Sequence, residues 1–103
     1  MKLTGQVAII VGGARGIGAA IAHTFSQEGA SLILVDLEKM KRELDAIAQA
    51  ISQKGGKAVS LIADCTDDQQ VNAMVDETVR RFGKIDVFVN SAGFRGPLVP
   101  VQD

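Results

Sequence analysis

The 103-residue sequence has little of what several classes of protein need. A single cysteine, Cys65, excludes an intrachain disulfide, and with a single histidine, His23, it leaves no set of ligands for a zinc site. No apolar run approaches the roughly 18 residues of a membrane span. A formal charge of −1 without a basic stretch argues against a nucleic-acid partner. Residues 1–6 lead directly into an apolar run and leave no room for a signal peptide. These absences predict a reduced, soluble, cytoplasmic protein without a membrane partner.

What is present is an alternation of short apolar runs with helical patterns. Strands are expected at 7–11, 31–35, 58–63 and 85–89, and helices after residue 16, over 37–54 and from 66 to about 82. The order predicts an α/β, Rossmann-like parallel sheet of four strands, in the order 3-2-1-4, with three helices. Residues 1–93 would form this half of a doubly wound domain, and 94–103 an irregular tail. Two local predictions are an apolar first-helix face, made of Ile17, Ala20, Ile21, Thr24 and Phe25, and a capping box from Thr66 to Gln69.

A glycine cluster follows the first apolar run. Gly12, Gly16 and Gly18 have the spacing G-x-x-x-G-x-G. A strand that enters a glycine turn and a helix start is suited to hold a phosphate on main-chain amides. A P-loop is excluded, because Ala19 and Ala20 replace the lysine and hydroxyl residue that it requires. The alternative is a plain strand–helix turn without a ligand.

The second strand ends on Asp36, 18 residues after Gly18. An acid near this offset binds the adenosine ribose hydroxyls in Rossmann-type folds. Its carboxylate would repel a 2′-phosphate, and the neighbouring Leu37 adds no positive charge, so NAD is favoured over NADP. The alternative role for Asp36 is an N-cap of the next helix.

Three motifs together resemble the short-chain dehydrogenase/reductase family over the whole chain. Val11 to Gly18 is similar to the family's T-G-x-x-x-G-x-G motif, and Asn90-Ser91-Ala92-Gly93 to its N-N-A-G motif. Asp64 stands where the family places an acid beside the adenine. Val11 and Ser91 depart from the usual Thr and Asn, which in the family help to tie the first strand to the fourth. The resemblance implies a cofactor site formed by Gly12, Arg15, Gly16, Ile17, Gly18, Asp36, Leu37, Asp64, Cys65, Asn90, Ala92 and Gly93.

Several of these roles have alternatives. Arg15 favours NADP, because NADP-preferring members of the family often carry a base before the second glycine. Asp64 could instead help to cap the third helix, and Asn90 and Gly93 could simply end the fourth strand. Cys65 is expected to be a packed residue rather than a nucleophile.

The sequence contains no tyrosine. In the family, hydride transfer depends on a Tyr-x-x-x-Lys pair and a serine, so the resemblance covers only the cofactor-binding half. We therefore expect these residues alone to bind a dinucleotide without catalysing a reaction. The alternatives are a stand-alone nucleotide-binding or interaction module and a remnant of the fold that binds nothing. Self-association through the edge of the fourth strand, or through a bare sheet face, is also expected.

Overall fold

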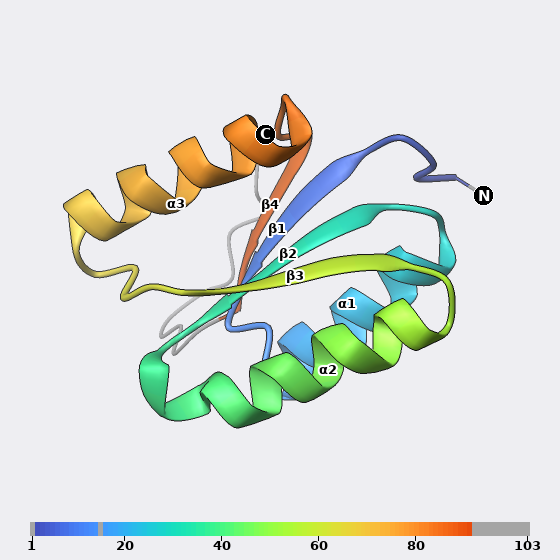
Figure 1. The fold of residues 1–103 in the computed structure, drawn as a ribbon, viewed down its shortest axis with the longest axis horizontal. Helices are drawn as coiled ribbons and strands as arrows, with labels where there is room; N and C mark the ends of the chain where they lie inside the picture. The colour runs from blue at the N-terminus through green and yellow to red at the C-terminus, as the bar shows by residue number, and fades with distance from the viewer. Residues whose placement is uncertain (1, 15, 92–103) are drawn as a thin grey trace.

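The computed structural model describes residues 2–14 and 16–91 and shows one twisted parallel sheet between two layers of helices (Figure 1). The sheet has the strand order β3-β2-β1-β4. Its strands are β1 (Val7–Val11), β2 (Ser31–Asp36), β3 (Lys57–Ile62) and β4 (Val87–Asn90). The helices are α1 (Gly16–Gln27), α2 (Lys41–Gln53), α3 (Asp68–Phe82) and a short 3₁₀ segment, η1 (Glu38–Met40). The predicted fold class, strand order and number of α-helices are confirmed.

The core lies on both faces of the two central strands. Along β1, Ala8 and Ile10 pack toward α1 and α2, whereas Val7, Ile9 and Val11 pack on the opposite side, toward α3. Burial on both faces explains why this strand is apolar throughout rather than alternating with polar residues. The central position of β1 places the segment after Val11 at the middle of the sheet.

The prediction for the buried face of α1 is correct in part, because Ile21 and Phe25 pack against the core. Gly18 and Ala22 are buried, whereas Ile17, Ala20 and Thr24 are exposed. Gly18 and Ala22, two small residues four positions apart, let the helix backbone approach the sheet closely. Ile21 and Phe25 are partly buried against the same core, whereas Ile17 is exposed. The periodicity of apolar residues does not predict that Gly18 is buried, because glycine has no apolar side chain.

The start of α3 also differs from its prediction. Asp67, not Thr66, is the N-cap, and its carboxylate accepts hydrogen bonds from the amides of Gln69 and Gln70 at 2.9 and 3.4 Å. Thr66 is drawn away from the cap because its amide and hydroxyl both donate to Asp64. Gly83 ends the helix at φ +85°, as its position predicts.

The predicted second helix begins as η1 and becomes α-helical at Lys41. No helix in the described part of the chain is long and apolar enough to span a membrane. The predicted tail, 94–103, lies outside the described residues.

Candidate functional site

The carboxyl ends of all four strands meet along one edge of the sheet. Val11 pairs with Val35 on one side and with Asn90 on the other, and Asp36 pairs with Ile62. This edge brings together nine of the residues predicted for the site: Gly12, Gly16, Ile17, Gly18, Asp36, Leu37, Asp64, Cys65 and Asn90. The remaining three, Arg15, Ala92 and Gly93, lie outside the described residues.

The turn after β1 is held by the neighbouring strand. The amides of Gly12 and Gly13 donate to the Val35 carbonyl oxygen at 2.7 and 3.1 Å, and the Ala14 amide donates to Asp36 Oδ2 at 3.2 Å. The turn's first three amides are therefore engaged within the protein. Amides without an intrahelical acceptor belong instead to the first turn of α1, which begins at Gly16. Among the described residues, the amides expected to bind an anion are therefore those at the start of α1.

The three glycines of the motif meet different requirements. Gly12 has φ +80°, a conformation that side chains disfavour. A Cβ at Gly18 would lie 2.1 Å from the Gly12 carbonyl oxygen and 2.7 Å from Ser91 Oγ, so no side chain fits there. Among the residues that the structure describes, none outside the immediate neighbours of Gly16 in α1 has an atom within 4 Å of a Cβ built there, and the φ of Gly16 is not positive. The internal structure therefore requires glycine at 12 and 18 but leaves the space beside Gly16 open.

Asp36 is only 2% exposed and braces the glycine turn. Besides the Ala14 amide on Oδ2, its Oδ1 accepts a hydrogen bond from the Leu37 amide at 2.8 Å. The alternative that Asp36 caps the next helix is wrong: Leu37 is the residue that precedes η1, and no side chain caps η1 or α2. The acid instead lies between the glycine turn and the end of β2, where a bound ribose would lie in a Rossmann-type site.

Asp64 shapes the loop after β3. Its Oδ1 accepts from the Thr66 hydroxyl at 2.7 Å and from the Thr66 amide at 2.9 Å. These bonds lower the pKa of the Asp64 carboxyl, so it stays ionised at neutral pH. Asp67 is the N-cap of α3. Asp64 supports this helix start as well, because its carbonyl oxygen accepts from the Asp67 amide at 3.0 Å and its amide donates to Gln70 Oε1 at 2.8 Å.

Cys65 adjoins this loop and packs against the cluster beneath α3. Burial raises the pKa of its thiol, and the nearby carboxylates of Asp64 and Asp36 raise it further. A protonated thiol is a weak nucleophile. The chemistry therefore agrees with the packing role expected for Cys65.

In the sequence, Ser91 stands out only because it departs from the family motif, whereas the structure gives it a specific contact. Its hydroxyl donates to the Val11 carbonyl oxygen at 2.9 Å and lies 3.4 Å from the Gly12 carbonyl oxygen. Ser91 thus joins the end of β4 to the start of the glycine turn. Its position directly after a strand-ending Asn90 is the signal that points to this function.

Comparison with known proteins agrees with this geometry. The short chain dehydrogenase family model matches residues 6–103. An uncharacterized oxidoreductase of Methylorubrum extorquens is 40% identical over 92 residues, which are 89% of this chain and 37% of that protein. Glucose 1-dehydrogenase 2 of Bacillus subtilis is 39% identical over 94 residues, 91% of this chain and 36% of the relative.

Solved structures give the same result. A hydroxysteroid dehydrogenase from Escherichia coli superposes with a TM-score of 0.85 at 38% identity, over 93% of this chain and 40% of that one. A dehydrogenase/reductase from Sinorhizobium meliloti has a TM-score of 0.85 at 40% identity, over 89% of this chain and 36% of its own.

The strand order and the arrangement of the strand ends define a Rossmann-type α/β fold. The chain belongs to the short-chain dehydrogenase/reductase family, and it spans between a third and two fifths of the length of these relatives. Members of this family use nicotinamide dinucleotide cofactors.

Proposed function

We propose that this chain is the NAD(H)-binding portion of a short-chain oxidoreductase that transfers hydride between a cofactor and a carbonyl or alcohol substrate. The single observation that carries the proposal is the open space at Gly16. Glycine costs about 1 kcal/mol relative to alanine in a helix interior and less at a helix start, so a glycine at position 16 is tolerated but not required by the helix. Neither a positive φ nor a close internal contact requires it at this position. Approach of a ligand to the backbone explains it, and the helix start offers amides to a diphosphate.

The residues present fit such a cofactor. Gly16, Ile17 and Gly18 would hold the diphosphate, and Asp36 the adenosine ribose. Asp64 and Cys65 would lie beside the adenine, and Asn90 near the nicotinamide ribose. Ile17, 71% exposed at this edge, offers apolar surface that a bound cofactor would cover. The remaining predicted contacts are part of the same proposal: Gly12, Arg15, Leu37, Ala92 and Gly93.

We propose NAD rather than NADP on electrostatic grounds. Asp36 is buried, and both of its oxygens already accept amide hydrogens, which orients the carboxylate firmly. A 2′-phosphate brought beside this carboxylate would meet a like charge in a poorly hydrated place. Two ribose hydroxyls would instead donate to it.

Bound NAD supplies the hydride acceptor, and the groups of this chain bind and orient the cofactor. The general acid/base that the family takes from tyrosine is not available in these residues, because the sequence has none. We therefore propose that these 103 residues bind the cofactor without turning over a substrate. The alternatives of a stand-alone nucleotide-binding or interaction module and of a remnant that binds nothing are tested by the same titration.

That titration measures NADH and NADPH binding by calorimetry. The expected result is a saturable heat with NADH and at least tenfold weaker binding of NADPH, the ratio that corresponds to about 1.4 kcal/mol. Tighter binding of NADPH would refute the cofactor assignment. No heat at millimolar NADH would eliminate the cofactor-binding portion and the nucleotide-binding module as ligand-binding proposals. Reduction of a ketone by the purified 103 residues would contradict the proposed lack of catalysis.

We also propose that the 103 residues self-associate, and that the protein works in the cytoplasm. Within residues 2–14 and 16–91, β4 pairs only with β1, so its other edge carries no strand from the described part of the chain. An apolar edge strand such as Val87–Asn90 favours pairing with another chain. Sedimentation at high micromolar concentration tests this proposal, and a stable monomer would contradict it.

A further inference from the structure

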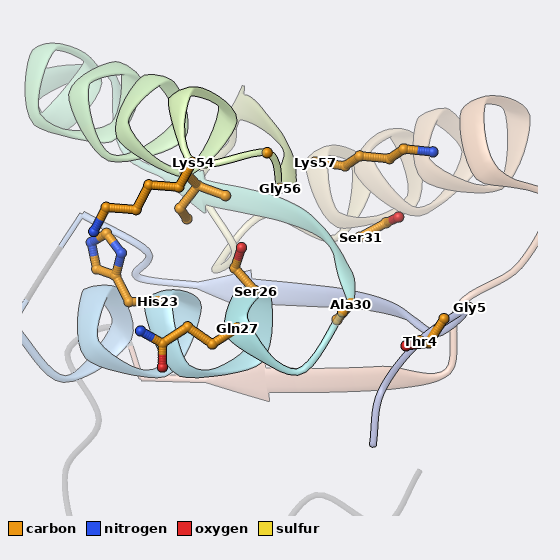
Figure 2. A pocket seen from close by; sticks show the side chains of 13 residues that line it. Thr4, Gly5, His23, Ser26, Gln27, Ala30, Ser31, Lys54, Gly56 and Lys57 are labelled. Carbon is orange, nitrogen blue, oxygen red and sulfur yellow. The ribbon is translucent and has the colours of Figure 1, made fainter. Parts of the chain in front are cut away.

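A pocket lies at the opposite end of the sheet from the candidate cofactor site. It has a volume of about 420 Å³ and lies between the end of α1, the end of α2 and the beginnings of β2 and β3 (Figure 2). This places it at the amino ends of the strands, whereas the glycine turn follows the carboxyl end of β1. The volume of this pocket falls within the range of about 300–1,000 Å³ that is typical of small-molecule sites, so it is larger than a site for one water or one ion.

The charge of the pocket is one-sided. Of its 13 lining residues three are basic (His23, Lys54 and Lys57) and none is acidic. In the whole chain, by contrast, 12 acidic residues stand against 11 Lys and Arg and one His. Neither His23 nor Lys54 forms an ion pair with any residue of the part that the structure describes. The basic groups of the pocket are therefore not neutralised by the fold.

The His23 and Lys54 side chains lie at the same end of the pocket. Figure 2 shows the Lys54 ammonium drawn toward the His23 imidazole, with the Ser26 side chain on the same wall, whereas the Lys57 ammonium extends away. The Ser26 hydroxyl has no hydrogen-bond partner among the described residues. An ammonium, an imidazole and a hydroxyl together supply the donors that an oxyanion accepts.

The carboxyl ends of α1 and α2 both face the pocket, and their last carbonyls accept hydrogen bonds from the amides that follow. At the end of α2, the Ile51 carbonyl accepts from the amides of Lys54 and Gly56, and the Ser52 carbonyl accepts from Gly55. The end of α1 is closed in the same way by the amides of Glu28, Gly29 and Ala30. These bonds satisfy the last carbonyls, but both helix C-termini keep a partial negative charge. The attraction for an anion therefore has to come from Lys54, His23 and Ser26.

The pocket also has room for more than the anionic group. Gly55 and Gly56 form a wall of bare backbone, and Ile51 and Ala30 add apolar surface. A Cβ at Gly56 would lie 2.4 Å from Ser26 Oγ, so glycine at this position keeps the wall next to Ser26 flat. We propose that this pocket binds a small phosphate monoester, with the phosphate between Lys54, His23 and Ser26 and the organic part along the glycine wall. This site is separate from the proposed NAD site and does not depend on it.

The test follows the imidazole proton resonance of His23, the single histidine of the sequence. The purified protein is titrated by NMR with glycerol 3-phosphate, inorganic phosphate and glycerol at constant ionic strength. The expected result is a saturable shift with both phosphates, tighter for the ester, and none with glycerol. Lys54→Gln should weaken binding about tenfold, as expected for loss of one charge-assisted hydrogen bond.

Arg42→Gln is the matched control, because it removes one positive charge from an exposed position of α2 outside the pocket. It should leave the affinity within about twofold. Equal weakening by Arg42→Gln, an equal response to glycerol, or no saturable shift with the ester would overturn the proposal. So would displacement of the phosphates by NADH, which would assign them to the glycine turn instead. Circular dichroism of each variant verifies that it is folded, and His23→Gln, read by calorimetry, provides a second variant for the same site.

Discussion

The Ser91 hydroxyl and the Ser91 amide both donate to the Val11 carbonyl oxygen, each at 2.9 Å. One serine thereby joins the end of β4 to the end of β1. The tie uses the main chain of Val11, while the Val11 side chain is buried in the cluster beneath α3. An apolar residue at 11 and a serine at 91 are therefore compatible with an intact junction, although both depart from the motifs that the sequence resembles.

Ser91→Ala tests this tie. Val11 keeps its bond to the amide of residue 91, so the loss is that of one hydroxyl bond, and the free energy of unfolding should fall by about 1 kcal/mol. Urea unfolding measures the change. Ser91→Thr keeps the hydroxyl and is the control. Equal stability of Ser91→Ala and the wild type would show that the hydroxyl bond contributes nothing to folding.

The glycines at 16 and 18 should respond differently to the same substitution. Gly18→Ala places a methyl group 2.1 Å from the Gly12 carbonyl oxygen and should destabilise the fold by about 1–3 kcal/mol. Gly16→Ala meets no atom of residues 2–14 and 21–91 within 4 Å and should leave stability about unchanged. Gly16→Ala should nevertheless weaken NADH binding, because the methyl group occupies the space left for the diphosphate.

Thermal unfolding and calorimetric titration of the two variants separate these effects. Unchanged NADH affinity in Gly16→Ala would remove the observation that carries the proposed function. Destabilisation of Gly16→Ala equal to that of Gly18→Ala would instead show that the space beside residue 16 is not open.

Asp36→Asn tests the choice of cofactor. The amide keeps an acceptor for the Ala14 or Leu37 amide but loses the charge that would bind ribose hydroxyls and repel a 2′-phosphate. Binding of NADH should weaken about tenfold, and the preference over NADPH should narrow. Asp76→Asn removes the same charge from an exposed position of α3 and should change neither affinity. If both variants behave alike, the effect of Asp36 is one of net charge rather than position.

Asp86 links stability to pH at the start of β4. Its Oδ2 accepts from the Val7 amide at 2.8 Å and pairs with Lys84 at 3.0 Å, and these contacts lower the pKa of the Asp86 carboxyl from 3.8. A carboxyl whose pKa is lower in the folded state binds protons more readily when unfolded. Its stabilising effect is therefore complete above its unfolded pKa and disappears as the pH falls through the folded value.

Asp86→Asn retains an acceptor for the Val7 amide but cannot titrate. The wild type should lose more unfolding free energy between pH 6 and pH 3 than this variant does, because the variant lacks one of the linked carboxyls. Urea unfolding at both pH values gives the comparison. A variant with the same pH dependence as the wild type would assign acid destabilisation to the other carboxyls whose pKa is lowered, those of Asp45, Asp64 and Glu77.

Much of the architecture follows from local pattern. The run Val7–Val11 predicts its strand with correct bounds, and the alternation of strands with helices leads to the observed order of the sheet. Helix boundaries at which two polar side chains compete for the same cap were harder to predict from the sequence. Thr66 and Asp67 are both good N-caps, and only the hydrogen bonds from Thr66 to Asp64 decide in favour of Asp67.

The sequence by itself determined the strands, the glycine spacing and the acid after β2, because strand period, turn chemistry and chain order are local properties. Tertiary structure decided which face of α1 is buried, that Asp36 braces the Ala14 amide, and which glycine leaves space open. It also brought His23 and Lys54, 31 positions apart in the chain, to one pocket. These outcomes depend on how closely separate segments approach one another, and that distance is fixed only when helices pack on the sheet.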